Sequence, residues 1–228
     1  PANLEYKTIG NPAAPQGGTF QMAFDAEPEK LNPINSSDLY ASYIYEYTLD
    51  GLMVMNLETY ELEPGLAERY EVSKDQMTYT FFLRKDLKWS DGKPLTAEDV
   101  KFSFDAVRDP KYKATQRLPY YETIGEVTVV DPLTVKISTK QKYYMNMEVM
   151  TSVGYTAIVP KHIYGDPKKK MNKDLVGSGP YLVESYNKGK NMILAKNKNW
   201  FGATVPHLKG KYNFDKIMIR FVKEDNLA

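Results

Sequence analysis

The chain has 228 residues, of which 42% are hydrophobic and 26% are charged, and its formal net charge is +1. This composition is typical of a globular protein, and the small net charge gives no indication of a nucleic-acid partner. Cysteine is absent, which excludes disulfides and thiolate metal sites. No apolar run approaches the roughly 20 residues that are needed to cross a bilayer.

The N-terminal part of the chain predicts an arm, a strand and a helix. Residues 1–17 are polar and are interrupted by glycine and proline, which is typical of an extended arm. The alternating segment 19–24 predicts a strand. A loop with two prolines follows, and either Ser37 or Asp38 could then cap a helix over roughly 39–50.

Tyrosine is abundant in the predicted helix over 39–50. Tyr43 and Tyr47 lie one turn apart and would share a face. They can be core residues, or they can line a cleft, because a polar loop precedes them. The whole chain holds 18 Tyr and 9 Phe. Strand propensity explains this bias, and so does an aromatic-lined cleft for flexible ligands.

Residues 66–107 carry the longest consistent pattern. Thr96, followed by Glu98 and Asp99, predicts a helix N-cap with acids in the first turn. Before it, two half-buried strands are predicted by residues at every second position, Leu66, Glu68, Tyr70 and Val72, then Met77, Tyr79, Phe81 and Leu83. We interpret this hairpin and helix as a scaffold that carries no chemistry.

The rest of the chain predicts mainly strands. Gly177 and Gly179 would let the backbone pass close to a neighbour. Strands are predicted over 51–55, 124–130, 133–138, 181–186, 192–195 and a last segment that ends at 222. A helix is predicted over 142–150, and residues 110–120 predict a polar surface loop.

The ordered string YTFFLRKDLKWSDGKPLTAEDVKFSFDAV, residues 79–107, resembles the family 5 extracellular solute-binding proteins. These are the periplasmic peptide and oligopeptide receptors of ABC importers. The residues that carry the resemblance are Tyr79, Phe81, Leu83, Arg84, Trp89, Asp91, Gly92, Pro94, Thr96, Asp99, Val100 and Phe104. The resemblance extends from Thr19 to Ala228.

Shorter segments add to the resemblance. They are the hairpin at 127–137, a strand followed by "PKHI" at 157–164, the "GSGPY" turn at 177–181, and "NKNWFG" at 197–202. The last of these has Lys198 where the family pattern has proline. The ending, residues 210–228, resembles the subgroup that includes receptors for microcin C and murein-derived peptides.

The resemblance implies an α/β (mixed α+β) fold of the type II periplasmic-binding-protein kind, with mixed sheets and packed helices. Family members are much longer, so we expect residues 1–17 to be an arm and residues 18–228 to be the first lobe. A subdomain insertion is expected at roughly 51–165, and a second lobe is expected to be absent. The expected location is the periplasm or the cell surface, with any signal peptide already removed.

The resemblance also implies a function. The protein is expected to capture peptides or peptide-like solutes and to deliver them to the membrane permease of an ABC importer. We expect a monomer with no nucleic-acid partner, cofactor or metal. By position in the family, the residues expected to contact ligand are Glu27, Asn35, Ser36, Ser37 and Tyr40, together with Ser152, Val153, Gly154 and Tyr155.

No catalytic motif accompanies this pattern, so we predict that the protein is not an enzyme. His162 and His207 are far apart and sit in no motif, and the glycines around Ser178 lack the spacing of a nucleophile elbow. Glu58 and Glu61, or Glu98 and Asp99, could be proposed as glycosidase carboxylates, although helix-cap and surface roles explain them better. A hydrolase acting on cell-wall peptides or sugars stays an alternative, and so does a stand-alone interaction or signalling module.

Overall fold

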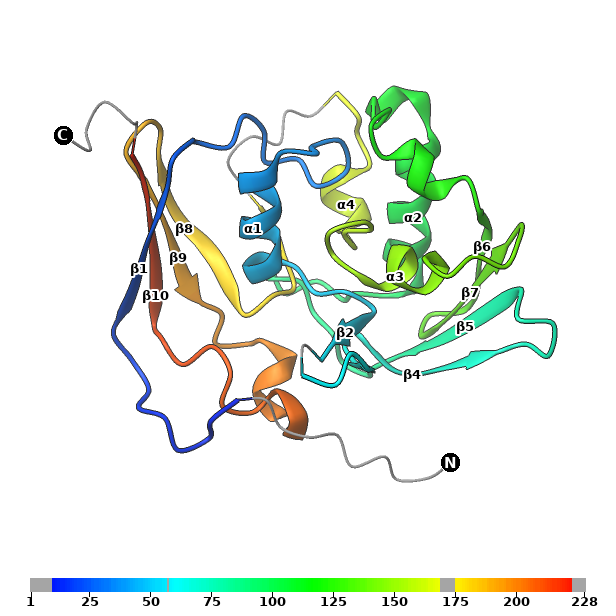
Figure 1. Ribbon diagram of the computed structural model, residues 1–228, viewed down its shortest axis with the longest axis horizontal. Coiled ribbons are helices and arrows are strands. Elements are labelled where there is room, and N and C mark those ends of the chain that lie inside the picture. Colours follow the sequence, from blue (N-terminus) through cyan, green and yellow to red (C-terminus); the bar gives the residue numbers. More distant parts are fainter. Residues whose placement is uncertain (1–9, 57, 169–174, 223–228) are drawn as a thin grey trace.

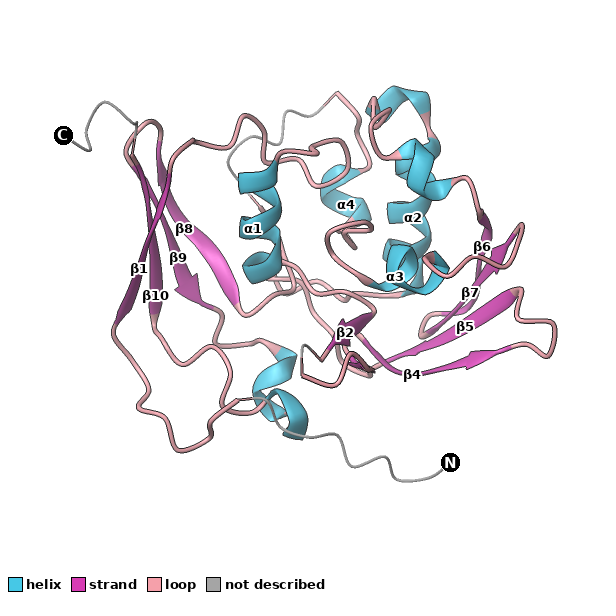
Figure 2. Ribbon diagram, viewed as in Figure 1, coloured by secondary structure: helices cyan, strands magenta, loops and turns pink. Residues whose placement is uncertain are grey.

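The computed structural model describes residues 10–56, 58–168 and 175–222. Its two larger sheets lie at opposite ends of the molecule, and the helices lie between them (Figures 1 and 2). The larger sheets have four strands each and a third sheet has two. The helices are α1 (Leu39–Thr48), α2 (Ala97–Arg108), α3 (Asn146–Thr151) and α4 (Lys161–Tyr164). The predicted mixed α+β class is confirmed.

The first large sheet joins segments from the two ends of the described chain. Its order is β1 (Thr19–Phe24), β10 (Lys216–Phe221), β9 (Asn191–Lys196) and β8 (Tyr181–Asn187). β1 runs parallel to β10, whereas β10, β9 and β8 are antiparallel neighbours. Ile217 and Ile219 of β10 are buried at every second position, as in a sheet with one covered face. The strands predicted in these four regions are confirmed.

The second large sheet is antiparallel throughout. Its order is β4 (Ala67–Val72), β5 (Thr78–Leu83), β7 (Thr134–Thr139) and β6 (Ile124–Asp131). Helix α2 packs over β6 and β7. The small sheet pairs β2 (Met53–Met55) with β3 (Leu62–Pro64). Short 3-10 helices cover Pro110–Tyr112, Leu118–Tyr121, Phe201–Thr204 and Pro206–Leu208.

Helix α2 begins as the sequence predicted, with a capping box between Thr96 and Asp99. The backbone N–H of Thr96 donates to Asp99 Oδ2 at 3.0 Å. The same oxygen accepts from Trp89 Nε1 at 3.3 Å, and Asp99 Oδ1 accepts from the backbone N–H of Lys161 at 2.9 Å. Asp99 is 6% exposed, so one buried carboxylate joins the loop before α2, α2 itself and the start of α4.

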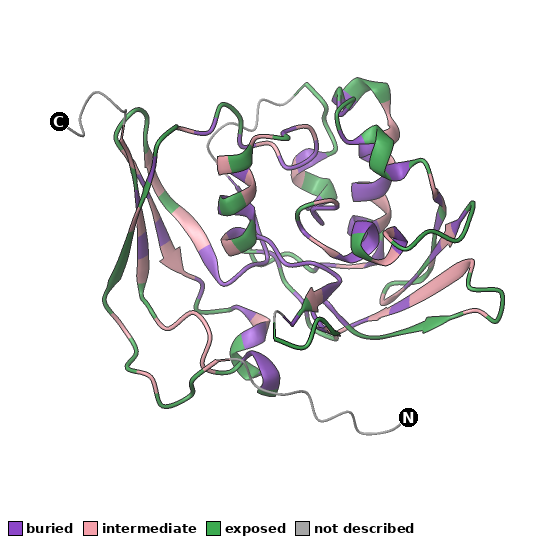
Figure 3. Cartoon of the chain, viewed as in Figure 1, coloured by how far each residue is buried: buried purple, intermediate pink, exposed green. Residues whose placement is uncertain are grey.

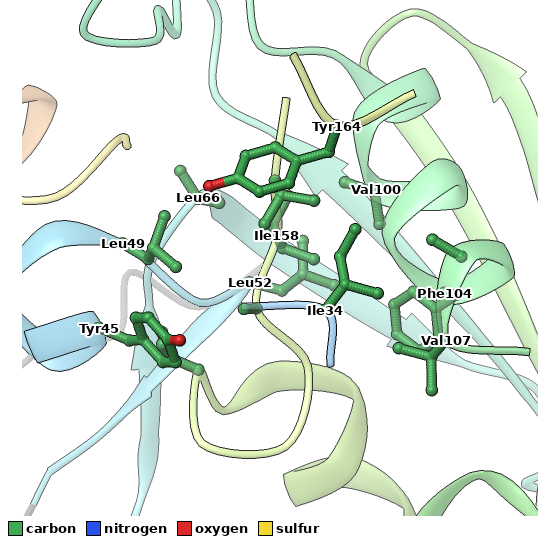
Figure 4. Packing of buried hydrophobic residues seen from close by; sticks show 14 of the residues in the cluster. Ile34, Tyr45, Leu49, Leu52, Leu66, Val100, Phe104, Val107, Ile158 and Tyr164 are labelled. Atoms are coloured by element: carbon green, nitrogen blue, oxygen red, sulfur yellow. The ribbon is translucent and has the colours of Figure 1, made fainter. Parts of the chain in front are cut away.

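One hydrophobic core fills the middle of the molecule. Tyr45 of α1, Phe104 of α2 and Ile158 of the segment before α4 are all buried within it. Figure 4 shows Ile34, from the loop before α1, lying among these side chains. Helices α1 and α2 each bury one face along their length, and Figure 3 shows buried and more exposed residues alternating along them. The loop that precedes α1 is therefore anchored on the same core as α2.

The glycines of the turn before β8 do what the sequence predicted. A Cβ on Gly177 would overlap the carbonyl oxygen of Thr48, and a Cβ on Gly179 would lie 2.5 Å from the carbonyl carbon of Thr48. The backbone N–H of Gly179 donates to the Thr48 carbonyl oxygen at 3.0 Å. This turn therefore lies against the C-terminal end of α1, closer than any side chain would allow.

The alternation predicted for residues 66–72 is wrong for β4. Leu66 and Ala67 are buried, but every residue from 68 to 72 is exposed. β4 is an edge strand, and its register shifts between Ala67 and Arg69. The outer part of this strand is drawn as exposed at the rim of the molecule in Figure 3. Because α2 packs over β6 and β7 at the opposite edge, β4 lacks the cover that would impose alternating burial.

Three further predictions need correction. The helix expected over 142–150 begins only at Asn146. The strand expected at the start of 157–164 is instead a buried, extended segment outside any sheet. The segment 110–120 is not a plain surface loop, because Tyr112, Ala114 and Arg117 are buried. Part of the predicted arm, the lysine run after 168 and the ending after 222 lie outside the described residues.

Candidate functional site

Most of the residues predicted to contact ligand lie in two loops that meet in space. The first loop precedes α1 and holds Asn35, Ser36 and Ser37, and the second follows α3 and runs over residues 152–155. The side chain of Arg117 contacts both loops. The fold thus brings residues 35–37 and residues 152–155 together although they lie far apart in the sequence, whereas Glu27 and Tyr40 of the predicted set lie elsewhere.

Arg117 lies directly before the 3-10 helix Leu118–Tyr121 and is 6% exposed. Its Nε and Nη2 donate to the carbonyl oxygen of Ser36 at 3.3 and 2.8 Å. Its Nη1 donates to the carbonyl oxygens of Gly154 and Tyr155 at 3.2 and 2.8 Å. Arg117 was not predicted as a functional residue, because a single arginine in a polar segment carries no periodic signal.

The first loop turns most of its polar side chains inward. Ser36 is 3% exposed, and its hydroxyl donates to the carbonyl oxygen of Lys30 at 3.2 Å. Asn35 Nδ2 donates to the carbonyl oxygen of Tyr112 at 2.8 Å. Ser37 is exposed, and its hydroxyl contacts the side-chain oxygen of Gln116. Of these three residues, Ser37 has the side chain most accessible from outside.

The second loop exposes Gly154 and part of the Tyr155 side chain at the surface. Val153 is buried, but Gly154 is exposed and Tyr155 is half-buried. Ser152 is half-buried, and its Oγ accepts from the backbone N–H of Gly154 at 3.3 Å. The Tyr121 hydroxyl holds the end of this loop, because it donates to the carbonyl oxygen of Tyr155 at 3.4 Å and lies 2.6 Å from Oγ1 of the next residue, Thr156.

Exposed tyrosines surround the second loop. Tyr120 is 50% exposed, and its ring lies edge-on to the ring of Tyr155 with 5.0 Å between centroids. Tyr144 is 84% exposed, and its ring centroid lies 4.7 Å from that of Tyr143. Burial, and then the neighbouring Glu148, Tyr120 and Tyr144, raise the pKa of Tyr155. We call Tyr120, Tyr143, Tyr144 and Tyr155 the tyrosine cluster.

Of this cluster, only Tyr155 was among the residues predicted to contact ligand. Tyr120 comes from the 3-10 helix after Arg117, and Tyr143 and Tyr144 come from the turn before α3. No spacing in the sequence relates these three segments. A tyrosine hydroxyl is protonated at neutral pH even at its ordinary pKa, so the Tyr155 hydroxyl can donate as well as accept a hydrogen bond.

Tyr40 lines a separate pocket of about 510 Å³ between β1 and α1. Tyr43 and Tyr47 line it as well, and Tyr43 is 45% exposed. The pocket thus fits the cleft-lining interpretation of these tyrosines, while Tyr45 is the core residue of the helix. The Tyr40 hydroxyl donates to Asp25 Oδ1. Burial raises the pKa of Glu46, a second carboxyl group at this pocket.

Glu27 lies on a different part of the fold from the two loops. Its Oε1 accepts from the Tyr186 hydroxyl at 2.5 Å, and its Oε2 accepts from the backbone N–H of Gly189 at 3.0 Å. Both partners belong to β8 or to the turn between β8 and β9. The carboxylate of Glu27 therefore ties the loop after β1 to that hairpin.

The two histidines have structural partners. His207 is buried, its Nε2 lies 2.9 Å from the carbonyl oxygen of Pro64, and burial lowers its pKa. His162 Nε2 lies 2.6 Å from Asp91 Oδ2. Across the described residues, no group of three metal-ligating side chains is present, and no helix is long and apolar enough to cross a membrane.

Comparison with known proteins gives the family. Residues 61–228 match the family described as bacterial extracellular solute-binding proteins, family 5 Middle. The chain belongs to this family. The match over residues 61–228 confirms the predicted family. Members of family 5 are solute-binding proteins of the periplasm or the cell exterior.

Individual relatives match over nearly the whole chain. The probable peptide-binding protein YejA of Agrobacterium fabrum is 29% identical over 237 residues, which are 100% of this chain and 38% of that protein. The crystal structure of the ABC transporter substrate-binding protein CtaP from Listeria monocytogenes superposes with a TM-score of 0.76 at 29% identity, covering 92% of this chain and 42% of that one.

A third relative was solved with a ligand. The oligopeptide-binding protein AppA from Bacillus subtilis, in complex with a nonapeptide, has a TM-score of 0.76 at 25% identity and covers 91% of this chain and 40% of that one. The chain therefore has the type II periplasmic-binding-protein fold that was predicted. It spans about two fifths of the length of these relatives.

Proposed function

We propose that this chain is the first lobe of a two-lobed receptor that captures peptides or peptide-like solutes for an ABC importer. The observation that carries the proposal is the pair of loops around Ser36 and Tyr155, which Arg117 joins into one surface beside the tyrosine cluster. Membership of family 5, and relatives named as peptide-binding, support the choice of ligand class. The location that follows is the periplasm or the cell surface, with an importer permease as partner.

The surface around the two loops has the chemistry that an extended peptide needs. The hydroxyls of Ser37 and Ser152 can exchange hydrogen bonds with a peptide main chain. The carbonyl oxygen of Gly154 accepts from Arg117 and keeps a second lone pair for a ligand N–H. The rings of Tyr120 and Tyr144 offer rigid apolar faces with a polar edge. Such groups accept varied side chains, because their contacts need no single partner. These features favour a receptor over a hydrolase.

The chain by itself is expected to bind ligand weakly. In two-lobed receptors the ligand is enclosed when the lobes close, and one lobe offers half of the contacts. We also expect the 228-residue chain to associate with itself, because rings such as Tyr43 and Phe20 are exposed beside the edge strand β1. Light scattering that shows a monomer at high concentration would count against this expectation.

The test uses the complete product of the gene that encodes this chain. The protein is purified under native conditions, denatured, and the released small molecules are identified by mass spectrometry. Peptides of defined length are the expected result, and calorimetry with the synthetic peptide then gives its affinity. Release of sugars or metal chelates with no peptide would overturn the ligand class.

The hydrolase alternative is tested with the same preparation. Cell-wall fragments are incubated with the protein, and the products are followed by chromatography. We expect no turnover. The candidate acids are the pair Glu58 and Glu61 and the pair Glu98 and Asp99. Hydrolysis that disappears in a folded variant with one of these acids changed to its amide would refute the receptor proposal.

A further inference from the structure

Arg117 is a buried charge whose partners are all main-chain carbonyl groups. It is 6% exposed, and no carboxylate of the described residues forms an ion pair with it. Its guanidinium donates instead to three carbonyl oxygens, those of Ser36, Gly154 and Tyr155. Burying an arginine without a counter-ion is costly. A contact that only filled space could be made by an apolar side chain at lower cost.

The geometry of these bonds fixes one loop relative to the other. Nε and Nη2 both donate to the Ser36 carbonyl, so that side of the planar guanidinium is set against the first loop. Nη1 is shared between two successive carbonyls of the second loop. Because the fork is rigid, the distance and the angle between the two loops follow from the group itself.

Neighbours of Arg117 reinforce the same connection. On one side, the carbonyl oxygen of Tyr112 accepts from Asn35, and Gln116 contacts Ser37. On the other side, the Tyr121 hydroxyl donates to the carbonyl oxygen of Tyr155 in the second loop at 3.4 Å, and it also contacts Thr156 directly after that loop. The segment 112–121 therefore contacts both loops along its length, and Arg117 is the residue within it that bridges them directly.

We propose that Arg117 is a positioning residue that sets the spacing between the loops at 35–37 and 152–155. The loops act as one surface only while this spacing holds, and the consequence for ligand rests on the proposed function above. Lysine cannot replace it, because a single ammonium nitrogen at the end of a flexible stem cannot hold two loops in a fixed plane.

The absence of cysteine allows a direct measurement of loop spacing. Ser37→Cys and Gly154→Cys place spin labels on two exposed positions, one in each loop. A Cβ at residue 154 meets only Ser152 Oγ, at 3.6 Å, so this label site is free of steric conflict. Pulsed electron spin resonance then gives the distribution of distances between the labels, without any ligand.

Arg117→Met and Arg117→Lys are compared with the doubly labelled parent. We expect both to broaden the distance distribution roughly two-fold, since the loops then move independently. Arg84→Met is the matched control. Arg84 is half-buried, and its Nε donates to the single carbonyl of Gly65 at 2.7 Å, outside both loops. The distance distribution of this control variant is expected to match that of the parent.

The outcome separates positioning from general stabilisation. If Arg117→Met does not fold by circular dichroism, Arg117→Lys decides, because it keeps the charge and most of the side-chain volume. A folded Arg117→Lys protein with the parental distribution would overturn the proposal. If the distribution broadens but a co-purified peptide binds the complete gene product as before, Arg117 positions the loops and the peptide lies elsewhere. That result contradicts the assignment of the ligand surface to these two loops, on which the proposed function is argued, while the role of Arg117 stands.

Discussion

The stretch at 79–107 and the loop pair around Arg117 are built in different ways. In the first, residues from several family motifs bind one another. Asp99 accepts from Trp89 at 3.3 Å and from the backbone of Lys161 at 2.9 Å. In the second, a single side chain holds two loops through carbonyl groups, and every carbonyl is available whatever the residue type. The motifs therefore identify the framework rather than the ligand surface.

Two more of the family-like segments contact each other through Asp50, just after the C-terminal end of α1. The backbone N–H of Asp50 donates to Ser178 Oγ at 3.0 Å, and Trp200 Nε1 donates to the Asp50 carboxylate at 3.3 Å. Ser178 and Trp200 belong to the GSGPY and NKNWFG segments. Buried polar groups of this kind need their specific partners, because each one left unpaired costs free energy. That requirement constrains the residue types, which is why these segments carry a readable pattern.

The largest expected effect is at Asp99, the centre of the framework. Asp99→Ala should lower the free energy of unfolding by about 3 kcal/mol, because it removes a helix cap and leaves the buried Trp89 N–H unpaired. Urea denaturation followed by circular dichroism measures the change. Glu98→Gln, one position earlier and exposed, is the control and should change stability by less than about 0.5 kcal/mol. Equal effects of the two substitutions would contradict the assignment of Asp99.

A smaller effect is expected at the glycine turn. Gly177→Ala should destabilise the protein by about 2 kcal/mol, because the added Cβ would overlap the Thr48 carbonyl. Gly154→Ala, in the second loop, makes the matched control, since its Cβ meets only Ser152 Oγ at 3.6 Å. Thermal melts of both variants test whether close backbone contact belongs to the framework and not to the loop. If Gly154→Ala lowered the melting temperature and Gly177→Ala left it unchanged, close backbone contact would belong to the loop and the prediction would be wrong.

Asp50 should give the framework a dependence on pH. Burial raises the pKa of Asp50 from 3.8 to about 7, partly offset by hydrogen bonds from Trp200 and Ser178. The folded state therefore holds this proton where the unfolded state has lost it. Stability is fully present below about pH 4 and falls toward pH 7, by at most about 1.4 kcal/mol per pH unit.

The contribution of Asp50 is isolated by difference. The free energy of unfolding is measured from pH 4 to 8 for the parent and for Asp50→Asn. We expect the parent to lose stability more steeply than the variant over this range. Parallel pH profiles for the two proteins would show that Asp50 titrates alike in the folded and unfolded states, and the prediction would fail.

The smallest effect on stability is expected on the ligand surface. Tyr120→Ser should change the free energy of unfolding by about 1 kcal/mol or less, because the ring is half exposed and pairs with Tyr155 alone in the tyrosine cluster. The affinity of the complete gene product for its co-purified peptide should nevertheless fall roughly ten-fold. Tyr70→Ser on β4 is the control, an exposed tyrosine of the framework that should leave the affinity unchanged. Similar losses in both variants would remove the distinction between the two regions.

Most of the framework was predictable from local patterns. Helix α2, its cap at Thr96 and the hairpins at 124–139 and 181–196 follow from spacing and turn residues that act over a few positions. The alternation expected in β4 failed because burial there depends on which strand of the sheet α2 covers. The helix expected over 142–150 starts too early in the sequence-based prediction. Tyr143 and Tyr144 lie in the turn before α3, where their rings contact each other in the tyrosine cluster.

The sequence by itself determined the family, the mixed α+β class and the close approach at Gly177 and Gly179, because each depends on specific residue types at fixed spacings. Only the tertiary structure decided how the candidate ligand surface is assembled. Residues 35–37 and 152–155 meet through Arg117, whose bonds go to carbonyl groups that every residue possesses. A contact to the main chain places no demand on the residue type of its partner, so the sequence carries no record of it.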